Sequence, residues 1–250
     1  MASIVKVVFF DVDDTLYDHS YHIHSGISAL RNEHEFLQTY SLDYLKQLSH
    51  ELLEEAHLKL LAGELSLTDA RRYRWKKFLE TFNQAANHDI DNFSGTYVKT
   101  YYDSERVVPG AIPLLQTLKQ EYSLGIISNN LLEEQLGKLR RLGISDYFDF
   151  FAISEEVGAA KPDRKIFEAA LERGKVTADN AVFIGDVWET DITGALNAGI
   201  RPIWLNRKGL PTKDSTVAEI SSLEPASNVL RHIRNESATP HITRPDPTKA

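Results

Sequence analysis

The sequence has no cysteine among its 250 residues. Disulfide bonds, thiolate nucleophiles and cysteine-based zinc sites are therefore excluded. No apolar run approaches the roughly 20 residues that a membrane-spanning helix needs. The apolar run at residues 4–10 is too short for a secretory signal and leads straight into acidic residues. These absences predict a cytoplasmic protein without a membrane partner.

Positive charge is also scarce, because 28 Lys and Arg stand against 36 Asp and Glu, for a formal net charge of -8. This balance argues against a protein whose main task is to bind nucleic acid or an anionic membrane. The length allows one large domain, or a core domain with a smaller insert. Both a monomer and a homodimer stay open.

The pattern of apolar residues changes along the chain. Residues 4–10 form a β-branched and aromatic run that is typical of a strand buried on both faces of a parallel sheet. From residue 19 to about 105, leucines and aromatic residues recur at helical spacing, which predicts roughly four helices. After residues 107–110, strands and helices alternate, with strands predicted at 124–127, 148–153, 181–184 and 202–205.

The first strand belongs to the same sheet as the later ones, although the helical block separates them. The predicted fold is therefore α/β, with a Rossmann-like parallel sheet core and helices on both of its faces. Residues 1–18 and 106–235 form this core, and residues 19–105 form an inserted all-helical domain. Residues 236–250 carry three prolines and few apolar residues, which predicts a flexible tail.

Polar residues follow the predicted strands, and in an open parallel sheet the active site lies beyond the carboxyl ends of the strands. The carboxylates, hydroxyls, amide and ammonium found at these ends are Asp11, Asp13, Asp14, Thr15, Ser128, Asn129, Lys161, Asp186 and Asp191. Clustered carboxylates repel each other unless a cation lies among them, and hard oxygen ligands suit Mg²⁺. Such a pocket can receive a phosphoryl group, and a carboxylate can then attack phosphorus.

Four segments resemble the ordered motifs of the haloacid dehalogenase-like hydrolase superfamily: Asp11 to Leu16, Ser128-Asn129, Lys161-Pro162, and Gly185-Asp186 with Asp191. The resemblance implies that Asp11 is the nucleophile and a metal ligand. Asp13 would act as general acid and base, and its backbone carbonyl would bind the metal. Asp186 would be a further ligand, and Asp191 would support the metal site.

The same resemblance assigns the phosphoryl group its partners. Ser128 and the backbone amide of Asn129 would hold phosphoryl oxygens, and Lys161 would offset their charge and that of the nucleophile. Thr15 would orient the loop that carries Asp13. The haloacid dehalogenases lack an acid at the position of Asp13, so its presence favours a phosphatase.

The helical block resembles the type 1 cap of this superfamily, which closes over the core and recognises the leaving group. Residues 153–162 and 188–199 are similar to those of pyrimidine 5'-nucleotidases and N-acylneuraminate-9-phosphate phosphatases. Within the block, helical spacing places Arg71 on the face of Trp75, Phe78 and Leu79. Arg71 is therefore the residue predicted to reach a substrate anion, although arginine stems also cover apolar surface.

These observations together predict a Mg²⁺-dependent phosphomonoester hydrolase. Its predicted partner is a small phosphate ester, with a nucleoside monophosphate or a sugar phosphate favoured. Two alternatives stay open. One is a phosphotransferase or mutase on the same core, and the other is a non-catalytic binding or regulatory protein that keeps the fold.

Overall fold

The structure is a computed structural model that describes residues 4–236, so the predicted tail beyond residue 236 lies outside it. The chain divides into two compact units. One consists of Met1–Tyr17 and Val107–Ala250, and the other of Asp18–Arg106. Every helix within the described range is too short or too polar to cross a membrane.

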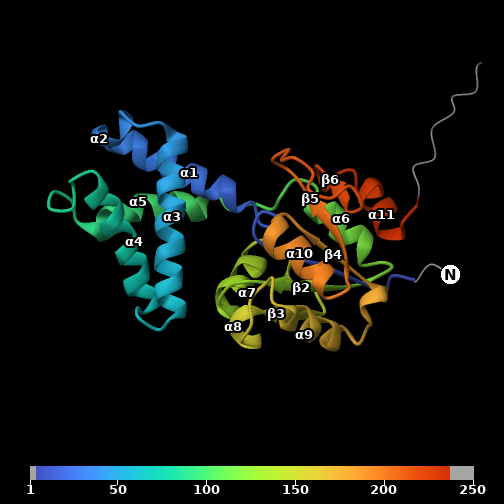
Figure 1. Ribbon diagram of the computed structural model, residues 1–250. Coiled ribbons are helices and arrows are strands. Elements are labelled where there is room, and N and C mark those ends of the chain that lie inside the picture. Colours follow the sequence, from blue (N-terminus) through green and yellow to red (C-terminus); the bar gives the residue numbers. More distant parts are fainter. Residues whose placement is uncertain (1–3, 237–250) are drawn as a thin grey trace, which may run out of the picture. The chain divides into compact units, whose positions relative to one another are not determined.

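The first unit is built on a six-stranded sheet with the strand order β3-β2-β1-β4-β5-β6 (Figure 1). All neighbouring strands pair in parallel. The strands are β1 (Val7–Phe10), β2 (Ser123–Ser128), β3 (Phe150–Ile153), β4 (Ala181–Gly185), β5 (Arg201–Leu205) and β6 (Ala218–Ile220). The predicted Rossmann-like sheet is confirmed. Strand β6 was not predicted, since its three residues are too few to show a pattern.

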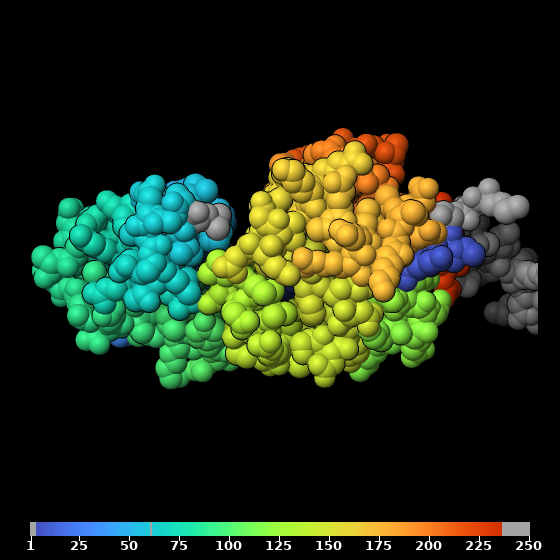
Figure 2. Space-filling model, turned by 90° about the horizontal axis from the view of Figure 1, so that it is seen from below, coloured from blue at the N-terminus to red at the C-terminus, as the bar shows by residue number. Residues whose placement is uncertain are grey.

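Every residue of β1 and β4 is buried, which explains why both segments are continuously apolar. Phe9 packs with the aromatic and aliphatic side chains of one face, while Phe10 is buried on the other. The helices of this unit are α6 (Ala111–Leu118), α7 (Leu132–Arg141), α8 (Ser154–Val157), α9 (Arg164–Gly174), α10 (Thr193–Asn197) and α11 (Ala226–Arg234). Two short 3-10 helices, η1 (Ser145–Tyr147) and η2 (Ala178–Asn180), and one turn of π-helix, η3 (Trp188–Ile192), complete the unit. Figure 2 shows segments from α6 to α10, coloured green to orange, at the surface of one face of this unit.

Gly125 of β2 has no room for a side chain. A Cβ atom at this position would lie 2.2 Å from Cε2 of Phe150 and 2.9 Å from Cδ1 of Phe9. We expect Gly125→Ala to lower the free energy of unfolding by about 1–3 kcal/mol, because both rings must shift. Urea denaturation measures the effect. Gly95→Ala is the control, since its Cβ would meet nothing within 4 Å. An unchanged midpoint for Gly125→Ala would contradict this strand register.

The second unit is helical, as its sequence pattern predicts. Its helices are α1 (His19–Glu33), α2 (Glu35–Gln38), α3 (Leu42–Leu61), α4 (Leu67–Thr81) and α5 (Ile90–Asp103). Ser41, Ser66 and Asp89 cap α3, α4 and α5 by accepting a backbone N–H of the first turn. Aromatic side chains fill the interior, among them Trp75 and Phe93 with ring centroids 5.9 Å apart. This unit therefore has a hydrophobic core of its own.

Candidate active site

Asp11 is the first residue after β1, and the sheet holds it in place. Its backbone N–H donates to the carbonyl of Ile184 in β4 at 2.9 Å, so the pairing of the two strands continues to this residue. The residue is buried, with 5% of its surface exposed. The buried strand thus delivers one carboxylate to the carboxyl edge of the sheet, as the strand-end argument predicts.

Lys161 joins two of the predicted carboxylates. Its Nζ donates to Oδ1 of Asp11 and to Oδ1 of Asp191, both at 2.6 Å. The side chain of Asn129 accepts from the backbone N–H of Lys161 at 2.7 Å and donates to its carbonyl at 3.0 Å. Asn129 at the end of β2 therefore fixes the backbone from which the ammonium reaches the carboxylates. The sequence had suggested only a role for the backbone amide of Asn129.

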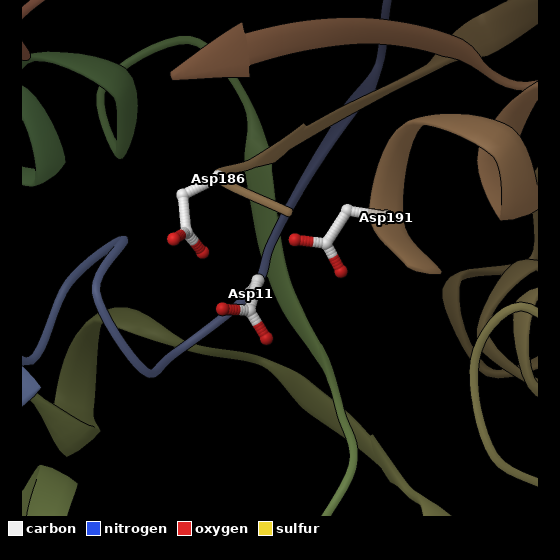
Figure 3. Close-up of side chains that lie close together, drawn as sticks. All are labelled: Asp11, Asp186 and Asp191. Atoms are coloured by element: carbon white, nitrogen blue, oxygen red, sulfur yellow. The ribbon is translucent and has the colours of Figure 1, made fainter. Parts of the chain in front are cut away.

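Asp186 and Asp191 complete a group of three carboxylates with Asp11 (Figure 3). One oxygen of each lies within 4.8 Å of those of the other two. Asp186 directly follows β4, and Asp191 comes from the turn η3. Oδ2 of Asp191 also accepts the backbone N–H of Val187 at 3.0 Å, which fixes its orientation. Figure 3 shows the three side chains close together.

Thr15 is fully buried, and its hydroxyl donates to Oδ1 of Asp186 at 3.4 Å. The structure therefore places Thr15 against a carboxylate of the cluster. The loop that carries Asp13 is closed by backbone bonds instead, including one from the N–H of Leu16 to the carbonyl of Val12 at 2.8 Å. The backbone N–H of Thr15 also donates to the carbonyl of Val12 at 3.3 Å, so this residue contacts both the cluster and the loop.

The ammonium of Lys161 pairs with only two of the three carboxylates, Asp11 and Asp191. Burial raises the pKa of Asp11 to about 7, because the charged form loses its hydration; Lys161 opposes this rise and Asp191 adds to it. Burial and the charges of Asp11 and Asp191 raise the pKa of Asp186 to about 8. For Lys161, burial favours the neutral form, but the two carboxylates outweigh it and the pKa rises.

This donor set fits a hard divalent cation. It offers only carboxylate oxygens, which suit Mg²⁺ better than metals that prefer imidazole or thiolate. A cation among Asp11, Asp186 and Asp191 would also favour their charged forms and so remove the cost that raises the two pKa values. The residues present therefore fit a magnesium ion.

Asp13 faces a different element, helix α7. Nζ of Lys138 donates to its Oδ1 at 2.6 Å, and Nε2 of Gln135 donates to its Oδ2 at 2.8 Å. The same nitrogen of Gln135 donates to Oγ of Ser128 at 2.7 Å. Sequence reasoning missed Gln135 and Lys138. The available signal was their three-residue spacing beside Leu139, which places polar groups on the buried face of an amphipathic helix.

Helix α4 buries a different arginine from the one that sequence reasoning selected. The structure leaves the side chain of Arg71 exposed and buries Arg74, which is 7% exposed. The guanidinium of Arg74 stacks on Trp75 with 4.6 Å to the ring centroid, and it donates to Oγ of Ser49. Arg71 lies four residues before Trp75, as the helical spacing predicts, but its side chain is exposed. Its contact with a substrate anion stays a prediction.

Comparison with known proteins identifies the family. Residues 5–199 match the family of haloacid dehalogenase-like hydrolases. The chain therefore belongs to this hydrolase family, as its four motifs predict.

Individual relatives agree with this assignment. The chain is 30% identical over 207 residues to pyrimidine 5'-nucleotidase YjjG of Escherichia coli, covering 80% of this chain and 85% of the relative. It is 34% identical over 206 residues to a glyceraldehyde 3-phosphate phosphatase of Methanothermobacter thermautotrophicus, covering 81% and 86%. Human N-acylneuraminate-9-phosphatase is 27% identical over 225 residues, covering 86% and 88%. The predicted resemblance to both subgroups is confirmed.

A solved structure supports the fold. The putative HAD-hydrolase YfnB of Bacillus subtilis superimposes with a TM-score of 0.68 at 24% identity, covering 93% of this chain and 99% of that protein. At this identity the likeness shows the fold alone. The two proteins thus share the overall fold.

Proposed function

We propose that the protein is a Mg²⁺-dependent phosphomonoester hydrolase that works through an aspartyl-phosphate on Asp11. The observation that carries the proposal is the cluster of Asp11, Asp186 and Asp191, in which Asp11 and Asp191 accept hydrogen bonds from the ammonium of Lys161. Such a site pairs a buried nucleophile with positive charge for phosphoryl oxygens. In this account the first unit is the catalytic core and the second is its cap.

The first step is transfer of the phosphoryl group to Asp11. Its Oδ1 accepts from Lys161, and we assign Oδ2 as the attacking atom. A bond forms between this oxygen and phosphorus while the ester P–O bond breaks, and Asp13 gives a proton to the leaving oxygen. Ser128 donates to a phosphoryl oxygen. Lys161 balances charge on Asp11 as the phosphoryl group arrives.

The second step releases phosphate. A water molecule attacks phosphorus, Asp13 takes its proton, and the bond from phosphorus to Asp11 breaks. Asp11, Asp186 and the backbone carbonyl of Asp13 would hold Mg²⁺, with Asp191 in a supporting position. When bound, Mg²⁺ supplies positive charge that offsets the carboxylates and the phosphoryl oxygens.

The proposed substrates are nucleoside monophosphates and sugar phosphates. Two relatives support this class, since one is named for a pyrimidine 5'-nucleotidase activity and another for glyceraldehyde 3-phosphate. The assay is release of inorganic phosphate by the pure protein with Mg²⁺, across 5'-nucleotides, sugar phosphates and p-nitrophenyl phosphate. If the protein released phosphate from none of these esters, the proposal would be contradicted. Transfer to an added alcohol instead of water would favour a phosphotransferase.

Affinity for Mg²⁺ is expected to increase with pH. The metal needs ionised carboxylates, and protons compete for Asp11 and Asp186, whose pKa values are about 7 and about 8. The dissociation constant should fall about tenfold or more between pH 6 and pH 8. Isothermal titration calorimetry measures it, and Asp186→Asn is the comparison variant with weakened binding. A dissociation constant that does not change over this range would contradict the assignment.

Stability of the metal-free protein should change in the opposite direction. Both carboxyl groups have folded-state pKa values above the ordinary value of 3.8, so the folded state binds their protons more tightly. The stability that the folded state gains from these two bound protons is lost as the pH rises from about 4 toward about 8. The melting temperature without metal should therefore fall over this window, and saturating Mg²⁺ should reduce the fall. A melting temperature of the metal-free protein that rises with pH over this window would contradict the prediction.

A further inference from the structure

Helix α7 directs two buried polar side chains at the loop after β1. Gln135 is fully buried and Lys138 is 7% exposed. They are three residues apart, so they lie on one face of the helix. Most of the other polar side chains of α7 are exposed or half-buried, as in an ordinary surface helix. Burying an ammonium and an amide costs hydration, which must be recovered from specific partners.

The partner of Lys138 is Asp13. Nζ lies 2.6 Å from Oδ1 and 2.9 Å from Oδ2, so one ammonium engages both oxygens of the carboxylate. The lysine side chain is 9% exposed and that of Asp13 is 28% exposed. Charge-assisted hydrogen bonds to both oxygens restrict rotation of the carboxylate. Lys138 therefore fixes the direction in which Asp13 presents its oxygens.

Gln135 joins Asp13 to Ser128. Its amide nitrogen carries two hydrogens, of which one goes to Oδ2 of Asp13 at 2.8 Å and the other to Oγ of Ser128 at 2.7 Å. Since the hydroxyl oxygen of Ser128 accepts this bond, its own hydrogen is directed elsewhere. One amide thus holds the carboxylate and sets the serine as a donor.

The other end of the Gln135 amide is not satisfied. Its Oε1 is buried and has no hydrogen-bond partner among residues 4–236. A buried acceptor without a partner costs folding free energy that an apolar side chain of similar size would not. Such a cost is expected where a residue serves function rather than stability.

We propose that Gln135 and Lys138 are positioning residues, which hold the carboxylate of Asp13 toward the leaving oxygen and direct the hydroxyl of Ser128 at the phosphoryl group. This inference rests on the proposed phosphatase function. Neither residue touches the reacting atoms in this scheme. Their effect passes through Asp13 and Ser128, so it depends on how much the leaving group needs a proton.

The test compares two esters in the variant Lys138→Met. For an alkyl phosphate, whose alkoxide must be protonated, kcat/KM should fall about 10- to 100-fold. For p-nitrophenyl phosphate, whose anion leaves without a proton, kcat/KM should fall less than about threefold. This ratio reports the steps up to phosphoryl transfer, so it leaves out the later hydrolysis, in which Asp13 acts with both esters. Lys138→Arg should restore part of the loss. Arg140→Met, an exposed cation of the same helix, should match the wild type. Equal losses with both esters would overturn the proposal, as would higher activity.

A double-mutant cycle separates positioning from general damage. If Lys138 acts through Asp13, then Lys138→Met should cause no further loss with the alkyl ester in an Asp13→Asn background. Independent losses that multiply would overturn the proposal. This outcome does not depend on small changes in stability, because both single variants are measured as folded proteins.

Gln135→Leu provides a second, independent variant. It removes both donated bonds and also the unpartnered acceptor, so the melting temperature should stay the same or rise. The loss of Ser128 orientation should raise the inhibition constant of inorganic phosphate about fivefold or more, the change expected for one charge-assisted hydrogen bond. Wild-type kinetics and phosphate inhibition would overturn the role of Gln135.

Failure of this inference can be told from failure of the proposed function. If the wild type releases phosphate from no ester, the proposed function fails. If the wild type is active and Asp13→Asn loses activity on the alkyl ester, but Lys138→Met and Gln135→Leu match the wild type, only the positioning inference fails.

Discussion

Replacing Asp11 with Asn is expected to lower phosphate release by about 10⁴-fold or more, the range seen when a catalytic nucleophile is removed. The amide nitrogen cannot form the aspartyl-phosphate, whereas the retained carbonyl oxygen can still accept from Lys161. The change also removes one charge from a crowded cluster in which burial raises the pKa of Asp11 to about 7. The fold should therefore be kept, with an unchanged or higher melting temperature near pH 8.

The control for this variant is Asp179→Asn, which makes the same chemical change at an exposed position. It should leave the turnover rate at the wild-type value. Steady-state assays with Mg²⁺ and far-ultraviolet circular dichroism measure activity and fold together. If Asp11→Asn kept more than a few per cent of the wild-type rate after repurification, Asp11 would not be the nucleophile.

Replacing Lys161 with Met is expected to lower turnover about 10²- to 10³-fold, as for the loss of one preorganised donor. Its Nζ holds Asp11 and Asp191 at 2.6 Å each, and both carboxylates would then face each other without a shared cation. Removing one partner of a buried ion pair costs about 3–5 kcal/mol. The melting temperature should therefore fall without metal, and Mg²⁺ should recover part of the loss.

Lys165→Met is the matched control. It makes the same change of charge and volume, but at an exposed position on α9. It should alter neither the rate nor the melting temperature by a measurable amount. Differential scanning fluorimetry with and without Mg²⁺ reads the stability of both variants. Wild-type activity in a folded Lys161→Met protein would contradict the role given to the ammonium.

The carboxylate cluster could be predicted because it depends on topology alone. The apolar runs of β1 and β4 mark buried strands, and parallel pairing brings their carboxyl ends to one edge. Asp11 and Asp186 directly follow these strands, so no knowledge of side-chain packing was needed to place them together. Lys161 was harder to place, since the double hydrogen bond of Asn129 to its backbone decides where its side chain starts.

The contacts that sequence reasoning missed depend on which face a helix directs at its neighbours. Gln135 and Lys138 look like ordinary polar residues of α7 until the helix is docked beside the loop of Asp13. The same holds for α4, where the structure buries Arg74 and leaves Arg71 exposed, although both lie within four residues of Trp75. Periodicity gives the buried stripe but not its edges, because neighbouring elements determine how wide that stripe is.

The most direct test of the account is a search for the phosphorylated enzyme. Protein is mixed with substrate and Mg²⁺, quenched in acid and digested, and the peptides are analysed by mass spectrometry. The account predicts one added phosphoryl group on the peptide that contains Asp11, and none in Asp11→Asn. Turnover of substrate with the phosphoryl group on another residue, or on no residue under single-turnover sampling, would contradict it.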